Sequence, residues 1–240
     1  MNIKLASNNF YASFSNFLPI NGVYSPGDEV DLLIFPGGED INPALYNQAP
    51  NGAVGWNDKR DAQEMMALRD FISGVEGRSP RRIKKVLGVC RGLQLMAAGF
   101  GGSLLQHVRQ PGATHGLVWI EPHPLSFMTD TNSLHHQAVN EPGKLWNYGG
   151  MILAVEPTYD TVEAVSWGDV AIGVQFHPEF FDKELGNRFF DVIISWANKR
   201  EMNLYRPPRI TADRITLDLE KYQAGAYRVT LDASTRKEQF

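Results

Sequence analysis

The single cysteine of this sequence, Cys90, is the first residue whose chemistry demands an explanation. It cannot form an intramolecular disulfide, so it is either a small buried hydrophobe or a nucleophile. The apolar run at 84–89 predicts a buried strand leading into Cys90, and residues 93–98 predict a helix directly after it. Gly88 and Gly92 flank the cysteine and would relieve the crowding of so sharp a turn. A helix N-terminus beside the sulfur stabilises a thiolate, so the pattern favours a nucleophile.

A histidine and a glutamate further along the chain could activate this thiol. His177 and Glu179 follow the apolar run 170–176, which predicts another strand. In an extended segment, side chains two residues apart share a face, and Pro178 between them keeps the backbone extended. Alone, this segment would favour a surface turn. Together with the cysteine, it predicts a base, His177, that is oriented by Glu179.

A pair of glycines supplies the third element. Gly37 and Gly38 follow the apolar run 30–35, a further predicted strand. Glycines permit positive φ and expose backbone N–H groups, which suits an anion or an oxyanion, although a plain turn is the alternative. The backbone N–H of Arg91, next to the cysteine, is a second candidate oxyanion donor.

The elements that must position these residues follow an alternating pattern. Apolar runs, including one at 151–155, alternate with helical patterns at 58–73 and 183–200. The sequence therefore predicts an α/β fold with a doubly wound, mainly parallel sheet flanked by helices. Such sheets bind ligands beyond the carboxyl ends of their strands.

The composition changes after Tyr205. Pro207 and Pro208 break the pattern, and residues 214–219 and 227–232 then alternate apolar and polar side chains. This alternation predicts a β-hairpin-like C-terminal appendage at 205–240, following a catalytic domain at 1–204.

Composition excludes several classes of protein. The 240 residues carry 23 basic and 27 acidic side chains, a net charge of −4, which argues against a nucleic-acid binder. No apolar run reaches the roughly 18 residues of a membrane span. The lone cysteine predicts a cytoplasmic protein, and we expect no signal peptide at the start of the chain.

The adjacent pair His135 and His136 raises the question of a metal. Neighbouring residues in an extended chain point in opposite directions, and no cysteine or carboxylate completes a ligand set at zinc spacing. The sequence therefore predicts no metal site.

Three blocks of sequence resemble the signatures of class I glutamine amidotransferases: Phe35-Pro36-Gly37-Gly38, the segment 88–94 around Cys90, and 175–179 with His177 and Glu179. In finer detail, PGGEDINPALY, CRGLQLMAAGFGGSLLQ, HHQAV and GVQFHPE resemble the γ-glutamyl hydrolase branch, peptidase C26, which includes γ-glutamyl-γ-aminobutyrate hydrolases. The resemblance covers residues 30–200 and implies a flavodoxin-like fold.

The resemblance also implies a chemistry and its residues. Cys90 would attack the γ-carbonyl of glutamine or of a γ-glutamyl amide to give a thioester, and His177 and Glu179 would complete the triad. Gly38 and Arg91 would form the oxyanion hole through their N–H groups. No metal or organic cofactor is implied. Further residues implied to bind the glutamyl group are Gly37, Gln94, Ser133, Leu134 and His135.

Three functions are compatible with this sequence. The first is a glutaminase that makes ammonia for a synthetase partner on another chain, because no P-loop GxxxxGK[ST] is present in this one. The second is a free-standing hydrolase of γ-glutamyl amides, which the HHQ and PGGEDINPALY details favour. The third is a non-enzymatic binding protein, against which the intact triad argues. The short start and the tail offer surfaces for a partner or a homo-oligomer, and we favour the first function.

Overall fold

The computed structural model describes residues 1–109, 113–120 and 122–199. The predicted hairpin at 205–240, and with it the proposed domain boundary, lies outside these residues. Among the described residues, no helix is long and apolar enough to cross a membrane.

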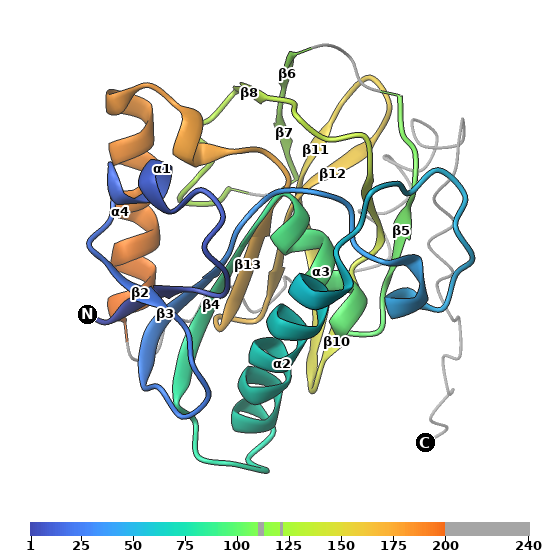
Figure 1. The fold of residues 1–240 in the computed structure, drawn as a ribbon. Coiled ribbons are helices and arrows are strands. Elements are labelled where there is room, and N and C mark those ends of the chain that lie inside the picture. Colours follow the sequence, from blue (N-terminus) through green and yellow to red (C-terminus); the bar gives the residue numbers. More distant parts are fainter. Residues whose placement is uncertain (110–112, 121, 200–240) are drawn as a thin grey trace, which may run out of the picture. The chain divides into compact units, whose positions relative to one another are not determined.

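A nine-stranded mixed sheet forms the centre of the described domain (Figure 1). Five neighbouring strands are parallel and form the half of the sheet that carries the sequence blocks. In spatial order they are β2 (Ile20–Val23), β1 (Ile3–Leu5), β3 (Val30–Phe35), β4 (Ile83–Val89) and β13 (Ala171–Val174). The sheet continues antiparallel through β12 (Thr161–Trp167), β11 (Tyr148–Glu156) and β10 (Lys144–Leu145), with β7 (Val118–Trp119) also paired to β11.

Helices cover both faces of this sheet (Figure 1). One face packs against α2 (Asp58–Val75) and α3 (Arg91–Gly99), which bury apolar side chains such as Phe71 and Leu93. The other packs against α1 (Tyr11–Ser15) and α4 (Lys183–Asn198), which bury Phe14 and Trp196. Burying apolar side chains on both faces is what stabilises a doubly wound sheet. The predicted α/β class is confirmed.

Side-chain caps fix where the two long helices begin. The Asn57 side chain accepts a hydrogen bond from the Arg60 N–H, and Asp182 accepts one from Leu185. Such caps satisfy N–H groups that have no partner inside the helix. The helices predicted at 58–73 and 183–200 are thereby confirmed to within two residues at each end.

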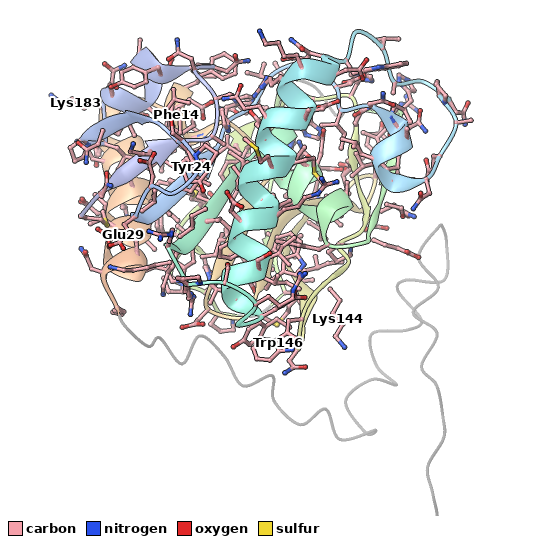
Figure 2. The ribbon with its side chains drawn as sticks, turned by 60° about the horizontal axis from the view of Figure 1, so that its bottom comes forward. Phe14, Tyr24, Glu29, Lys144, Trp146 and Lys183 are labelled. Atoms are coloured by element: carbon pink, nitrogen blue, oxygen red, sulfur yellow. The ribbon has the colours of Figure 1, made fainter. Side chains whose placement is uncertain are left out.

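The two edges of the sheet lie far apart. Phe14 of α1 lies near the β2 edge, and Trp146 lies in the turn between β10 and β11 at the other edge (Figure 2). Two small antiparallel pairs complete the described elements: β5 (Ser103–Leu105) with β9 (Ala138–Glu141), and β6 (Thr114–Gly116) with β8 (Asp130–Asn132). Two short 3₁₀ turns are η1 (Pro43–Tyr46) and η2 (Pro178–Phe180).

Candidate active site

Cys90 occupies a strained turn between β4 and α3. Its φ of 52° and ψ of −108° are unfavourable for any residue with a Cβ. Its N–H donates to the Val174 carbonyl of the neighbouring strand at 2.7 Å, which ties the turn to β13. Strain of this kind costs on the order of 1–3 kcal/mol and persists where the surrounding structure enforces it. The geometry is that of a nucleophile elbow at the carboxyl edge of the sheet.

Glycine is required on both sides of this turn, at Gly88 in β4 and at Gly92 in α3. A Cβ at Gly92 would lie 1.9 Å from the Phe35 carbonyl oxygen, at the end of β3. A Cβ at Gly88 would lie 2.7 Å from the backbone of Gly92. The small residues that the sequence placed around Cys90 therefore allow α3 to start in contact with two strand ends.

His177 is held between Cys90 and Glu179. Its Nδ1 lies 2.8 Å from Glu179 Oε1, and Cys90 lies close enough to affect the charge of the ring. Burial of the ring opposes the charged form, but the hydrogen bonds and charges of Cys90 and Glu179 outweigh it and raise the pKa of His177 to about 10. This balance favours the positively charged form of the His177 ring.

The route from β13 to Glu179 differs from the extended segment that the sequence predicted. The strand ends at Val174, and Pro178 opens the 3₁₀ turn η2. Proline is well suited to the first position of such a turn because its φ is fixed and it lacks an N–H. Glu179 reaches His177 by this turn rather than along one face of a strand.

Three contacts to His177 were not found by sequence reasoning. Asn132 of β8 accepts from the His177 N–H and donates to the His177 carbonyl, both at 2.8 Å. The Phe180 ring stacks on the imidazole at a centroid distance of 5.1 Å, and Phe10 meets it edge-on at 5.7 Å. A lone asparagine and two phenylalanines carry no motif, so only the fold brings them together.

The glycine pair lies directly beside the triad. A Cβ at Gly37 would lie 2.4 Å from His177 Cε1, so only glycine allows this approach. Gly38 has a φ of 140°. The glycine loop of the first sequence block therefore packs directly against His177 of the third block.

Arg60 of α2 fixes the orientation of that loop. Its Nη2 donates to the carbonyls of Pro36 and Gly37 at 3.0 and 2.7 Å, and Nη1 donates to Glu39 at 2.6 Å. In a trans peptide the C=O and N–H point in opposite directions. Because the Gly37 carbonyl faces Arg60, the Gly38 N–H faces away from it.

A buried ion network supports both sides of this arrangement. Glu64 accepts from Arg60 at 2.9 Å and also pairs with Arg91, whose guanidinium also pairs with Asp61. All four side chains are buried. The network joins Arg91, which follows Cys90, to Arg60, which orients the glycine loop. No motif in the sequence indicated Arg60.

The residues expected to bind the glutamyl group differ in burial and in their partners. Gln94 is buried and donates its amide hydrogens to the Gln137 carbonyl and the Gln175 side chain. Ser133 directly follows Asn132 and is buried, whereas Leu134 is exposed. The ring of His135 is buried and faces Glu163 of β12.

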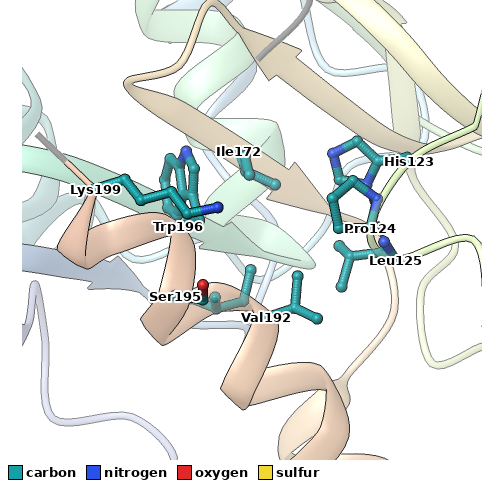
Figure 3. A pocket seen from close by; sticks show the side chains of 9 residues that line it. His123, Pro124, Leu125, Ile172, Val192, Ser195, Trp196 and Lys199 are labelled. Carbon is teal, nitrogen blue, oxygen red and sulfur yellow. Dashed lines mark hydrogen bonds between the residues drawn. The ribbon is translucent and has the colours of Figure 1, made fainter. Parts of the chain in front are cut away.

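An apolar pocket on the α4 face is lined by none of the triad residues (Figure 3). Its walls include Ile172, Val192 and Trp196, with His123 at one side. Burial lowers the pKa of His123 to about 4, so this ring is neutral at physiological pH. The pocket therefore offers apolar packing rather than catalytic groups.

An elbow cysteine, a hydrogen-bonded histidine and glutamate, and a glycine loop at the carboxyl edge of a mixed sheet define the class I glutamine amidotransferase-like superfamily. A family model for peptidase C26 matches residues 22–179. The chain belongs to the peptidase C26 family.

Individual proteins agree with this assignment. A glutamine amidotransferase-like protein of Lactococcus lactis, YvdE, is 30% identical over 181 residues, which cover 65% of this chain and 71% of the relative. The glutamine-hydrolyzing GMP synthase of Bacteroides fragilis is 28% identical over 132 residues, 51% of this chain and 23% of that enzyme. A crystal structure from Thermoplasma acidophilum, described as that of a GMP synthase subunit, shares the fold, with a TM-score of 0.56, 15% identity and coverage of 82% and 94%.

Proposed function

We propose that this protein is a glutaminase of the amidotransferase type. The observation that carries the proposal is the array of Cys90, His177 and Glu179, in which a strained nucleophile and an oriented base meet at one sheet edge. Acyl transfer by a thiol requires these two groups and a site for the developing oxyanion.

The proposed reaction runs through a thioester. The Cys90 thiolate attacks the γ-carbonyl carbon of glutamine, and the C–N bond breaks as His177 gives its proton to the departing ammonia. Water then attacks the thioester while His177 removes its proton, and the C–S bond breaks, which releases glutamate and restores the Cys90 thiolate and the protonated His177. The N–H groups of Gly38 and Arg91 would stabilise the oxyanion in both steps, and Glu179 would keep Nε2 of His177 directed at the sulfur.

We further propose that the ammonia serves an acceptor enzyme on another chain in the cytoplasm. The relative named as a GMP synthase hydrolyses glutamine within a longer chain, of which the matched segment is 23%. The single cysteine supports a reducing compartment.

Membership of peptidase C26 favours a second candidate, a free-standing hydrolase of γ-glutamyl amides. Both reactions use the same thioester and differ in the leaving amine. Ammonia release from glutamine, compared with amine release from a panel of γ-glutamyl amides, separates them. We expect glutamine to have the highest kcat/KM and Cys90→Ser to abolish turnover of every substrate. A γ-glutamyl amide that is cleaved much faster than glutamine would establish the second candidate instead.

A further inference from the structure

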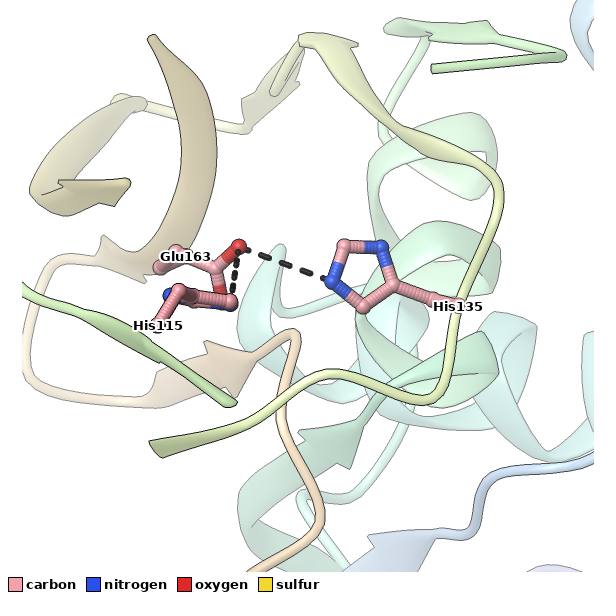
Figure 4. A group of neighbouring side chains, drawn as sticks. All are labelled: His115, His135 and Glu163. Carbon is pink, nitrogen blue, oxygen red and sulfur yellow. Dashed lines mark ion pairs between the residues drawn. The ribbon is translucent and has the colours of Figure 1, made fainter. Parts of the chain in front are cut away.

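A second group of buried histidines and a carboxylate lies outside the triad (Figure 4). His115 of β6, His135 of the segment after β8, and Glu163 of β12 come together. The Nε2 atoms of the two histidines lie 3.5 and 3.6 Å from Glu163 Oε1, and the three side chains are at most 4% exposed. The three atoms lie within 4.8 Å of one another.

The outer nitrogens of both rings are already committed. Nδ1 of His115 lies 3.0 Å from the Gly116 carbonyl, and Nδ1 of His135 lies 2.9 Å from the Gln137 carbonyl. A carbonyl can only accept, so each Nδ1 carries the hydrogen. In the neutral ring, Nε2 then presents a lone pair toward Glu163.

The centre of this group lacks a positive partner. Within the described residues, neither Nε2 atom and neither oxygen of Glu163 has a hydrogen-bond partner. Separations of 3.5 and 3.6 Å exceed the 2.7–3.2 Å typical of N–H···O bonds. Lone pairs and a buried carboxylate that face one another are unfavourable unless a positive charge lies between them.

We propose that His115, His135 and Glu163 bind a divalent transition-metal ion, with Zn²⁺ as the ion they fit best. Ligand atoms about 2.0–2.1 Å from a tetrahedral metal lie about 3.4 Å apart, close to the two distances from Glu163 to the histidine nitrogens. Histidines that ligate metals through Nε2 commonly donate Nδ1–H to a backbone carbonyl, as both rings do. Two imidazoles and one carboxylate are an established donor set for such ions.

The proposed ion would stabilise the frame around the triad rather than take part in the reaction. It would join β6 and the segment at 135 to β12 of the central sheet. The strand paired with β6 is β8, whose Asn132 holds the backbone of His177 through two hydrogen bonds. The pair His135 and His136 did not reveal this group in the sequence, because His136 does not belong to it and Glu163 is distant in sequence.

Metal content is the direct test. The untagged full-length chain, purified without chelator, should contain close to one transition-metal ion per chain by plasma mass spectrometry. After dialysis against a chelator, the apoprotein should melt at a lower temperature and recover on addition of Zn²⁺. Co²⁺ added to the apoprotein should give a visible absorption band that saturates at one equivalent and is abolished by Zn²⁺.

Variants locate the ion. Glu163→Gln and His115→Gln should weaken Co²⁺ binding by more than the roughly 10–100-fold that loss of an outer partner costs. The matched control is His136→Gln, because His136 adjoins His135 but is partly exposed and paired with Asp40 at 3.0 Å. Cys90→Ser is the second control, and both controls should bind Co²⁺ like the wild type.

Two results would overturn the proposal. One is a well-folded wild type that contains no metal and gives no Co²⁺ band or Zn²⁺-dependent change in melting temperature, which would identify the group as a protonated histidine cluster. The other is loss of the Co²⁺ band in Cys90→Ser with retention in Glu163→Gln, which would place the ion on the triad. Neither result depends on enzymatic activity, so the metal site and the proposed glutaminase function are tested independently.

Discussion

Two buried histidine–carboxylate groups in this molecule have opposite hydrogen-bonding arrangements. In the triad, Nδ1 of His177 faces Glu179 at 2.8 Å, so the carboxylate holds the ring and supports its positive charge. In the second group, each Nδ1 faces a backbone carbonyl and each Nε2 faces Glu163 at 3.5 or 3.6 Å. The hydrogen-bond partner of Nδ1 therefore decides whether Nε2 acts as a base or as a metal ligand. A carboxylate there makes a base, whereas a carbonyl leaves a neutral ligand.

The largest effect should come from removing the base of the first group. We expect His177→Ala to lower kcat by at least about 10⁴-fold, as in other nucleophile–base pairs. The ammonia assay measures the rate, and Co²⁺ binding should stay unchanged because the second group is intact. Substantial turnover in a folded His177→Ala protein would remove this histidine from the mechanism.

A smaller effect should follow from loosening the glycine loop. Arg60→Met removes the donor to the carbonyls of Pro36 and Gly37, so the Gly38 N–H loses its fixed direction. We expect kcat to fall by up to roughly 10²–10³-fold, the cost of losing one oxyanion donor, with a smaller change in KM.

The control for Arg60→Met is thermal melting, since Glu64 and Glu39 lose a partner. Gly38→Pro deletes the proposed donor and also moves φ from 140° to about −65°, so its kcat should fall at least as far as that of Arg60→Met. If both variants fold and retain full kcat, the loop does not stabilise the oxyanion.

The pH dependence should reveal the charge that Glu179 supports. With a His177 pKa of about 10, kcat/KM of the wild type should fall at the alkaline end near that pH. Glu179→Gln removes one of the interactions that raise this pKa, so the alkaline limb should move to lower pH. A limb that does not move would mean that another group titrates there.

Stability should follow the same ionisation. The folded-state pKa of His177 lies above its ordinary value of 6.5. The charged ring therefore contributes stability that is complete below about pH 6.5 and is lost as the pH rises through about 10. Glu179→Gln should flatten this decline in a series of urea unfolding curves.

The smallest effect concerns the ring stacked on the base. Phe180→Leu removes an aromatic contact worth about 0.5–1.5 kcal/mol, so we expect kcat/KM to fall by roughly two- to ten-fold. Steady-state kinetics with glutamine measures it. A larger loss of kcat/KM in Phe180→Leu than in His177→Ala would contradict the role of His177 as the base.

Local pattern predicted much of the parallel half of the sheet and the cysteine turn. Runs such as 30–35 and 84–89 are mostly apolar because most of their residues are buried between the helices on the two faces of the sheet, and the structure places strands there. The strand β12 escaped notice because it contains threonine, glutamate and serine, although all seven residues are buried. The short N-terminal strands β1 and β2 were also not predicted.

Long-range contacts explain what the sequence did not reveal in the site. Asn132 is brought to His177 by the pairing of β6 with β8, and Arg60 is brought to Gly37 by the packing of α2. Glu163 of β12 meets His115 of β6 and His135 after β8 only through tertiary packing between separate sheets. Residues joined by tertiary packing alone leave no spacing in the sequence to detect.

The hydrogen bond from Cys90 to Val174 has a consequence for protein synthesis. The ribosome makes the nucleophile well before it makes β13 and the turn that carries the base. Until those later residues have emerged and β13 has paired beside β4, the thiol lacks the imidazole that activates it. A nascent chain that is released early therefore carries Cys90 without His177 beside it, and the two residues come together only in a chain whose central sheet is complete.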